Sequence, residues 1–211
     1  MNKTKPIFLL LVFLIIISCN QVSTNVKVIG IQSFGNVDKY LVDTIKQTII
    51  DVYDFDNVVI LKDKPLPKSA FIHVKSPGYR ADSILKILKR EMPDSIDYVI
   101  GITNKDISTT KRDDEGNILK PENKYTDWGI FGVGYRPGVS CVISTFRIQS
   151  AGKKKFITRL KKICMHEIGH NLGLKHCTYN DKCVMRDAAE TIKTVDNIDL
   201  KLCNYCSSLL E

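Results

Sequence analysis

Histidine is scarce in this chain of 211 residues, which has four histidines against seven cysteines. There is no internal repeat and no low-complexity linker, so a repeat array is excluded. The apolar run at Ile7–Ile17 is shorter than the roughly 20 residues that a membrane-spanning helix needs. No basic stretch is interleaved with aromatic residues, which argues against nucleic-acid binding in spite of a formal net charge of +8. With 44% apolar and 26% charged residues, the composition is that of a globular protein with a proper core.

The N-terminus has the pattern of a secretory signal. Lys3 and Lys5 precede the apolar run, which ends in Ile16-Ile17-Ser18-Cys19. That tetrapeptide resembles the lipobox of bacterial lipoproteins. The resemblance implies that residues 1–18 are a signal peptide, that Cys19 is the lipidated first mature residue, and that 19–25 form a short tether. The protein would then be lipid-anchored to a membrane of the bacterial cell envelope, periplasmic or surface-exposed. A plain signal peptide and an uncleaved anchor are the alternatives.

Residues 26–211 are predicted to be one α/β domain, because strand-like and helix-like patterns alternate along them. Strands are expected at Val26–Gln32, Val58–Leu61, Ala70–Val74, Tyr98–Ile102, Gly129–Tyr135 and Val139–Phe146, and helices at Val37–Tyr53, Ser83–Met92 and Lys153–Leu172. The polar stretch from Thr103 to Trp128 is too long for a simple connection and is interpreted as functional or mobile. These patterns favour a substantially parallel sheet.

The last predicted helix carries a metal-binding pattern. His166 and His170 are four residues apart and therefore neighbours on the helix surface. Gly173 can end the helix in a left-handed conformation, so that His176 can turn back as a third ligand. Three neutral histidines leave zinc an open position for water, whose pKa zinc can lower from about 15.7 to about 7. Glu167 is placed to act as the general base in peptide-bond hydrolysis.

Two cysteine pairs follow, and their spacing is typical of a four-cysteine zinc site. Cys177 and Cys183 precede a helical stretch, and Cys203 and Cys206 follow it. Two other interpretations remain open. Cys203-x-x-Cys206 could be a redox pair, and two disulfides among the four would suit an oxidising compartment. Cys141 and Cys164 are expected to be buried thiols, with a disulfide between them as the alternative.

The string HExxHxxGxxHC, followed by CxM and CxxC, resembles the archaemetzincins, a branch of the metzincin metalloproteases. This implies a zinc peptidase with a metzincin-like fold: a mixed twisted sheet, a backing helix, an active-site helix and a small C-terminal subdomain over 174–211, after an N-terminal subdomain to about 173. The resemblance implies two zinc ions per chain. It assigns the catalytic zinc to His166, His170 and His176, the general base to Glu167, the Met-turn to Met185, and the structural zinc to Cys177, Cys183, Cys203 and Cys206. Five residues separate Cys177 from Cys183, one more than the family usually has.

A peptide or protein is the expected substrate. Metzincins bind it as an extended strand along a sheet edge, and that edge is expected at Gly129–Tyr135, with Gly132, Val133 and Gly134 as contacts. Trp128 and Tyr135 could line a subsite or belong to the core. The positive charge could attract acidic substrates or anionic lipid, or be a solvated surface with Lys161 and Lys162 on the helix exterior.

A rival from another class is a catalytically inert zinc-binding surface lipoprotein that uses the same fold to bind protein or peptide. Such a protein has no need of Glu167, so the presence of this residue favours the peptidase. Both aminopeptidase and endopeptidase activity are compatible with these residues.

Overall fold

The computed structural model describes residues 27–149, 152–187 and 191–210. The predicted signal peptide, Cys19 and the tether lie outside these residues. In chain order the strands are β1 Val28–Phe34, β2 Asn57–Ile60, β3 Phe71–His73, β4 Pro77–Arg80, β5 Tyr98–Thr103, β6 Ile107–Thr109, β7 Trp128–Ile130, β8 Gly132–Gly134 and β9 Ser140–Ser144. The α-helices are α1 Lys39–Val52, α2 Ala81–Arg90, α3 Glu122–Tyr125, α4 Lys153–Asn171, α5 Ile192–Asn197 and α6 Asn204–Ser208.

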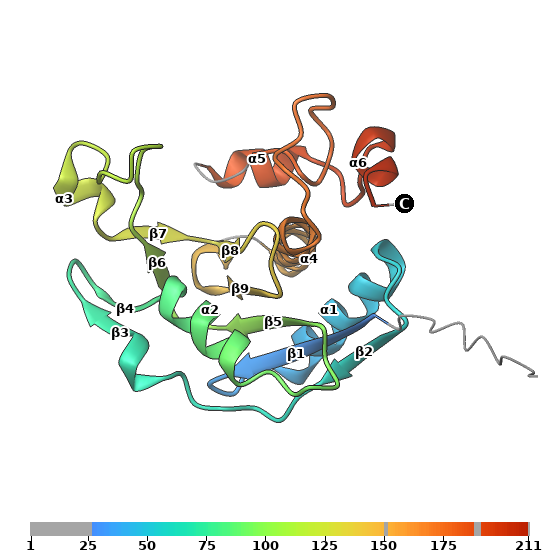
Figure 1. The fold of residues 1–211 in the computed structure, drawn as a ribbon, viewed down its shortest axis with the longest axis horizontal. Helices are drawn as coiled ribbons and strands as arrows, with labels where there is room; N and C mark the ends of the chain where they lie inside the picture. The colour runs from blue at the N-terminus through green and yellow to red at the C-terminus, as the bar shows by residue number, and fades with distance from the viewer. Residues whose placement is uncertain (1–26, 150–151, 188–190, 211) are drawn as a thin grey trace, which may run out of the picture.

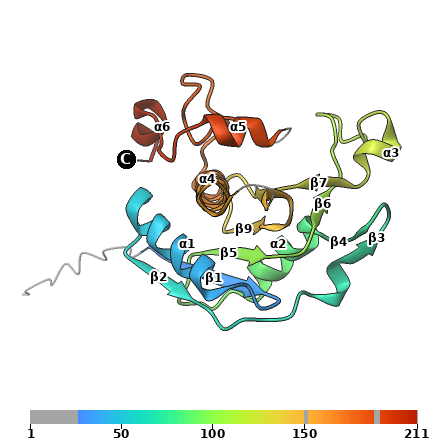
Figure 2. The same ribbon diagram turned by 180° about the vertical axis from the view of Figure 1, so that it is seen from behind.

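The main sheet has five strands in the order β2-β1-β5-β9-β8. All neighbours are parallel except β8, which pairs antiparallel with β9 and forms one edge of the sheet. Helices cover both faces, with α1 and α4 on one side and α2 on the other (Figures 1 and 2). Successive strand residues point to opposite faces, so Ile100 and Cys141 pack with α1 and α4 while Val99 and Val142 pack with α2. The predicted α/β architecture with a mostly parallel sheet is confirmed.

A second sheet, in the order β3-β4-β6-β7, was not predicted. Its strand β6 and the short helix α3 lie inside the polar stretch 103–128, where short elements with little apolar alternation leave no periodic signal. The predicted continuous strand Gly129–Tyr135 is wrong in its extent. The chain leaves the second sheet at Ile130 and joins the main sheet at Gly132, so Phe131 separates two strands with different partners.

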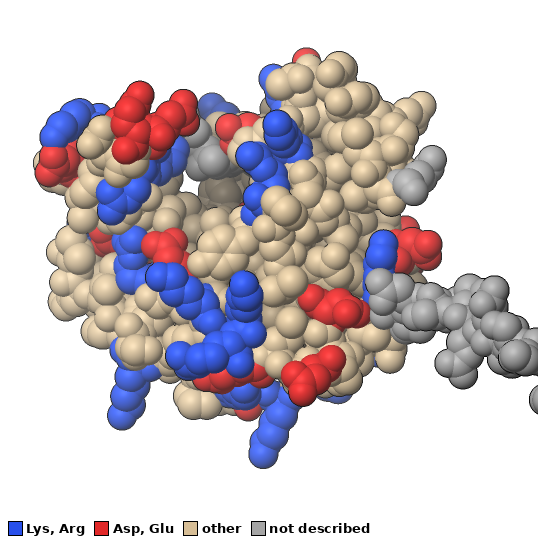
Figure 3. Space-filling model, viewed as in Figure 1, with Lys and Arg blue, Asp and Glu red and all other residues tan. Residues whose placement is uncertain are grey.

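Basic side chains are unevenly distributed over this framework. Figure 3 shows Lys and Arg side chains gathered over the region where Figure 1 places α2. Within the described residues, none of the helices combines the length and apolar composition that crossing a membrane requires.

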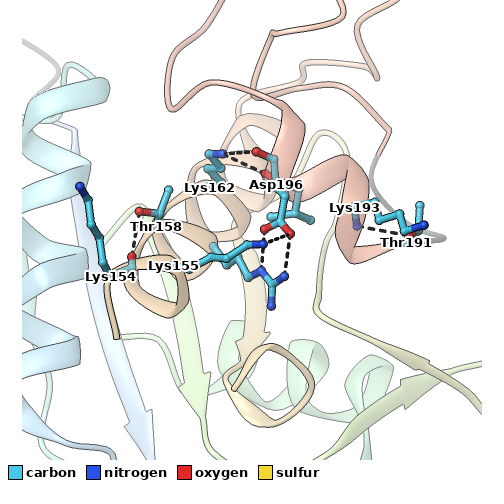
Figure 4. A network of polar contacts seen from close by, with 9 residues as sticks. Lys154, Lys155, Thr158, Lys162, Thr191, Lys193 and Asp196 are labelled. Atoms are coloured by element: carbon cyan, nitrogen blue, oxygen red, sulfur yellow. Dashed lines mark hydrogen bonds and ion pairs between the residues drawn. The ribbon is translucent and has the colours of Figure 1, made fainter. Parts of the chain in front are cut away.

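The C-terminal segment packs over α4, on the side of that helix away from the main sheet (Figure 1). An ion-pair cluster joins α5 to α4: the Arg159 guanidinium binds both oxygens of Asp196, each at 2.6 Å, and Lys155 binds the same carboxylate at 2.9 Å (Figure 4). Lys162 is 7% exposed and donates to the backbone carbonyl of Val195 at 3.0 Å. The expectation that Lys162 lies on the helix exterior is therefore wrong, because the C-terminal segment covers that part of α4.

Candidate active site

Three histidine side chains converge where α4 ends. His166 and His170 lie one turn apart on α4, and His176 returns toward them after a sharp turn at Gly173, whose φ is +97°. The Leu174 amide donates to the Gly169 carbonyl and the Gly173 amide to the His170 carbonyl, which is the Schellman pattern of a glycine-terminated helix. The predicted left-handed turn at Gly173 is confirmed.

The spacing of the three rings fits a single tetrahedral ion. One nitrogen from each ring lies within 4.8 Å of the others, and the Nε2 atoms of His170 and His176 are 3.2 Å apart. Zinc–nitrogen bonds of 2.0–2.1 Å in a tetrahedron would place neighbouring nitrogens about 3.3 Å apart. The donor set and its spacing therefore suit zinc.

Backbone carbonyls orient two of the rings. His166 Nδ1 donates to the Val184 carbonyl at 2.9 Å, and His170 Nδ1 donates to the Leu174 carbonyl at 2.8 Å. A carbonyl accepts only, so each Nδ1 carries the proton and each Nε2 presents a lone pair to the cluster. Burial, followed by the charge of His170, lowers the pKa of His166 to about 3, so this ring is neutral at neutral pH.

Glu167 is enclosed beside the histidines by strand β8. Its side chain is buried, and burial raises its pKa to about 8, opposed by a hydrogen bond from the Gly134 backbone. A Cβ at Gly132 would come within 2.9 Å of Glu167 Cγ, and one at Gly134 within 2.8 Å of the Glu167 carbonyl oxygen. The absence of side chains at Gly132 and Gly134 therefore allows β8 to lie close to α4.

Met185 lies directly against α4 at Gly169, between the two helical histidines. A Cβ on Gly169 would collide with the Met185 sulfur and would come within 2.9 Å of the Tyr53 hydroxyl. Met185 is fully buried, and its carbonyl accepts a hydrogen bond from the Cys177 amide at 2.8 Å. Gly169 was not recognised from the sequence, because it occupies one of the unspecified positions of the histidine motif.

The four C-terminal cysteines also converge. The sulfurs of Cys177, Cys183, Cys203 and Cys206 all lie within 4.8 Å of one another, and those of Cys177 and Cys203 are 3.6 Å apart. Thiolates about 2.3 Å from zinc would be about 3.8 Å apart in a tetrahedron, so this set too suits zinc. Cys141 and Cys164 are free and fully buried, in β9 and α4.

A cavity of about 260 Å³ opens beside the histidines and Glu167. Gly132, Val133 and Gly134 line one side of it, so the predicted substrate contacts lie next to the predicted catalytic residues. The remaining wall is mostly apolar and includes Trp128, Ile130, Ile163, Val195 and Ile198. Tyr135 lies outside this cavity.

Comparisons with known proteins agree with this geometry. The family model "Peptidase family M54" matches residues 22–211. The archaemetzincin of Haloquadratum walsbyi is 34% identical over 168 residues, which cover 75% of this chain and 85% of that protein. The crystal structure of the Methanopyrus kandleri archaemetzincin has a TM-score of 0.70 at 26% identity and covers 89% of this chain and 95% of that one.

The Archaeoglobus fulgidus archaemetzincin structure has a TM-score of 0.66 at 28% identity and covers 86% of this chain and 98% of that one. The fold inferred from the resemblance to archaemetzincins is thereby confirmed. The family assignment accounts for the convergence of three histidines and a buried glutamate on one cavity. The chain therefore belongs to peptidase family M54, is similar over most of its length to archaemetzincins, and is a zinc metallopeptidase.

Proposed function

We propose that His166, His170 and His176 hold the catalytic zinc and that Glu167 is the general base for peptide-bond hydrolysis. The observation that carries this assignment is a buried carboxyl group directly beside three converging imidazoles. When bound, zinc supplies Lewis-acid chemistry, which acidifies water and polarises a carbonyl group. The histidines contribute neutral nitrogen lone pairs, because the Nδ1 protons of His166 and His170 are held by backbone carbonyls.

The surroundings of Glu167 suit proton transfer. A general base works best when its pKa is near the working pH, and burial raises the pKa of Glu167 to about 8. The Gly134 backbone hydrogen bond favours the charged form and restrains the carboxyl group on the cavity wall. Glu167 would accept a proton from the attacking water and later deliver one to the leaving amine nitrogen.

The free edge of β8 and the apolar cavity suit an extended peptide. Strand β8 ends the main sheet, so its outward backbone groups are available to pair with substrate. A substrate in that position would present a side chain to the cavity bounded by Trp128, Ile163 and Val195. We assign Gly132, Val133 and Gly134 as backbone contacts on this basis.

The test is the substitution Glu167→Gln. This change keeps the shape of the side chain and removes the base, so hydrolysis of a peptide library should fall roughly 10²–10⁴-fold while zinc content is unchanged. His166→Ala is the matched comparison and should lose zinc as well as activity. Full activity in Glu167→Gln would contradict the assignment. A wild-type protein that binds zinc and peptide but hydrolyses none of the library would instead support the inert binding protein.

We further propose that the four C-terminal cysteines bind a second, structural zinc. We also propose that Met185 forms the Met-turn beneath the catalytic zinc. The support is the sulfur spacing, which is close to a tetrahedral edge. Zinc analysis of the wild-type chain should then give two ions, and His166→Ala should retain one. One zinc in the wild type together with no titratable thiol in the four-cysteine set would establish the disulfide alternative.

Membrane attachment through Cys19 is proposed from the lipobox-like sequence alone. The expected location is the bacterial cell envelope, with the catalytic domain tethered to a membrane. Mass spectrometry of the mature N-terminus should find a diacylglycerol-modified Cys19, and Cys19→Ala should release the protein from the membrane fraction. An unmodified N-terminus at another residue would exclude lipidation.

A further inference from the structure

A basic groove lies beyond the end of β8. It has a volume of about 610 Å³ and is lined by Lys86, Lys89 and Arg90 of α2 and by the connection from Tyr135 to Val139, which includes Arg136. All four cationic side chains are exposed.

This groove has no acidic wall. None of its lining residues is Asp or Glu. Arg90 pairs with Glu91 at 3.1 Å, but Lys86, Lys89 and Arg136 form no ion pair in the part of the chain that the structure describes. Three uncompensated positive charges around one depression give it a positive potential that favours an anionic occupant.

The groove is attached to the catalytic helix. Asn171, the residue after His170, donates from its side-chain amide to the Tyr135 and Ser140 carbonyls, both at 2.9 Å, and its carbonyl accepts from the Gly138 amide at 3.1 Å. The connection that carries Arg136 is therefore fixed at the end of α4.

The groove begins directly after the proposed substrate-binding strand, because Tyr135, the residue that follows β8, is one of its lining residues. Arg136 is two residues beyond Gly134, the last residue of β8, or about 7 Å at 3.3 Å per residue. A peptide paired with β8 would extend past this end of the strand. Antiparallel pairing, which is the more stable arrangement per residue, would direct the part of the substrate N-terminal to the scissile bond toward Arg136 and α2.

We propose that the basic groove of Lys86, Lys89, Arg90 and Arg136 is a substrate subsite that selects peptides with acidic residues two to four positions N-terminal to the scissile bond. This inference rests on the proposed peptidase function and specifies its substrate class.

The experiment uses matched fluorogenic peptides that carry either two glutamates or two glutamines at those positions. The wild type should cleave the glutamate peptide with a kcat/KM about tenfold higher, mainly through a lower KM. Lys86→Glu/Lys89→Glu should abolish that preference, measured as the ratio of kcat/KM for the glutamate peptide to kcat/KM for the glutamine peptide, while the control variant keeps the wild-type ratio. Lys154→Glu is the control for charge reversal, because Lys154 lies about 24 Å from His170 along α4 and outside the groove. Equal kcat/KM values for both peptides in the wild type would overturn the proposal, as would a preference for glutamates placed C-terminal to the scissile bond.

A second measurement separates this proposal from the catalytic one. The Glu167→Gln variant should bind a labelled glutamate peptide more tightly than the glutamine peptide in fluorescence anisotropy, whether or not hydrolysis is detected. Equal binding of the two peptides would contradict the proposed subsite in the groove and leave the proposed catalytic site unaffected. Vesicles of anionic phospholipid provide the other comparison: if Lys86→Glu/Lys89→Glu weakens vesicle binding but leaves peptide preference intact, the groove is a membrane contact and the acidic-peptide subsite is excluded.

Discussion

At the scale of single residues, Gly169 determines how closely Met185 can approach the histidine helix. The position has no room for a methyl group, since the Met185 sulfur and the Tyr53 hydroxyl occupy that space. We expect Gly169→Ala to cost about 1–3 kcal/mol through overpacking and to lower the zinc content of the histidine site. Thermal unfolding and zinc analysis of the same preparation measure both effects.

A double-mutant cycle provides the control for this effect. Met185→Ala removes the sulfur, so adding Gly169→Ala to that background should cost distinctly less than it does in the wild type. If the two losses are simply additive, the contact between Gly169 and Met185 does not explain the constraint.

The histidines, Glu167 and Gly173 could be predicted from the sequence because they are separated by fixed helical spacings and one turn. The packing of Gly132 and Gly134 against α4, and of Gly169 against Met185, could not be predicted. Each depends on a side chain or backbone from an element distant in the sequence, and nothing in the local pattern shows which element approaches. The carbonyls of Val184 and Leu174 were missed for a different reason, since any residue supplies a carbonyl.

At the scale of elements, Asp196 connects α5 to the active-site helix. Its carboxylate binds Arg159 and Lys155 of α4 and is only 20% exposed. Asp196→Asn would leave the 7%-exposed Arg159 without its anionic partner, and we expect a loss of about 2–3 kcal/mol. The melting temperature should fall by about 5–10 °C in differential scanning calorimetry. Asp54→Asn, at an exposed aspartate that forms no ion pair with any residue the structure describes, should leave the melting temperature unchanged.

The same contact predicts a dependence on pH. The pKa of Asp196 is lowered, first by its hydrogen bonds with Arg159 and then by Lys155, against an unfolded value of about 3.9. A lowered folded-state pKa means that its stabilisation is complete above the unfolded value and is lost as the pH falls below it. The stability difference between wild type and Asp196→Asn should therefore shrink below about pH 4. A difference that stays constant down to pH 2 would rule out this linkage.

Long elements were predictable from periodicity, and short ones were not. The helices α1, α2 and α4 and the strands of the parallel sheet have apolar residues at helical or buried-strand spacing, and they begin and end close to the predicted bounds. Strands β6 and β7 have three residues each and are defined by their pairing with each other and with β4. Local sequence carries little information about such pairing. For this reason a single strand was predicted at Gly129–Tyr135, where β7 and β8 belong to different sheets.

At the scale of the whole molecule, the folded structure of the segment after α4 depends on its contacts with α4 and on the four-cysteine cluster. Its helices α5 and α6 have six and five residues and are too short to be stable alone. We expect Cys203→Ser/Cys206→Ser to reduce zinc from two ions to one, lower the melting temperature and expose the segment to limited proteolysis. Cys141→Ala changes a buried thiol outside the four-cysteine set and should retain both ions. Two ions in the double variant would exclude the proposed structural site.

His176, the last of the three proposed zinc-binding histidines, and Cys177, the first of the four clustered cysteines, are consecutive residues. A single peptide bond therefore joins the two proposed metal sites. Fixing the backbone at either residue reduces the conformational freedom that the other must lose when its own ion binds. With both ions bound as proposed, we expect occupancy of the two sites to be positively cooperative, and thermodynamic reciprocity would then require each ion to raise the affinity for the other by the same factor. The proposed structural ion would then help to set the zinc concentration at which the peptidase becomes active, although it does not touch substrate.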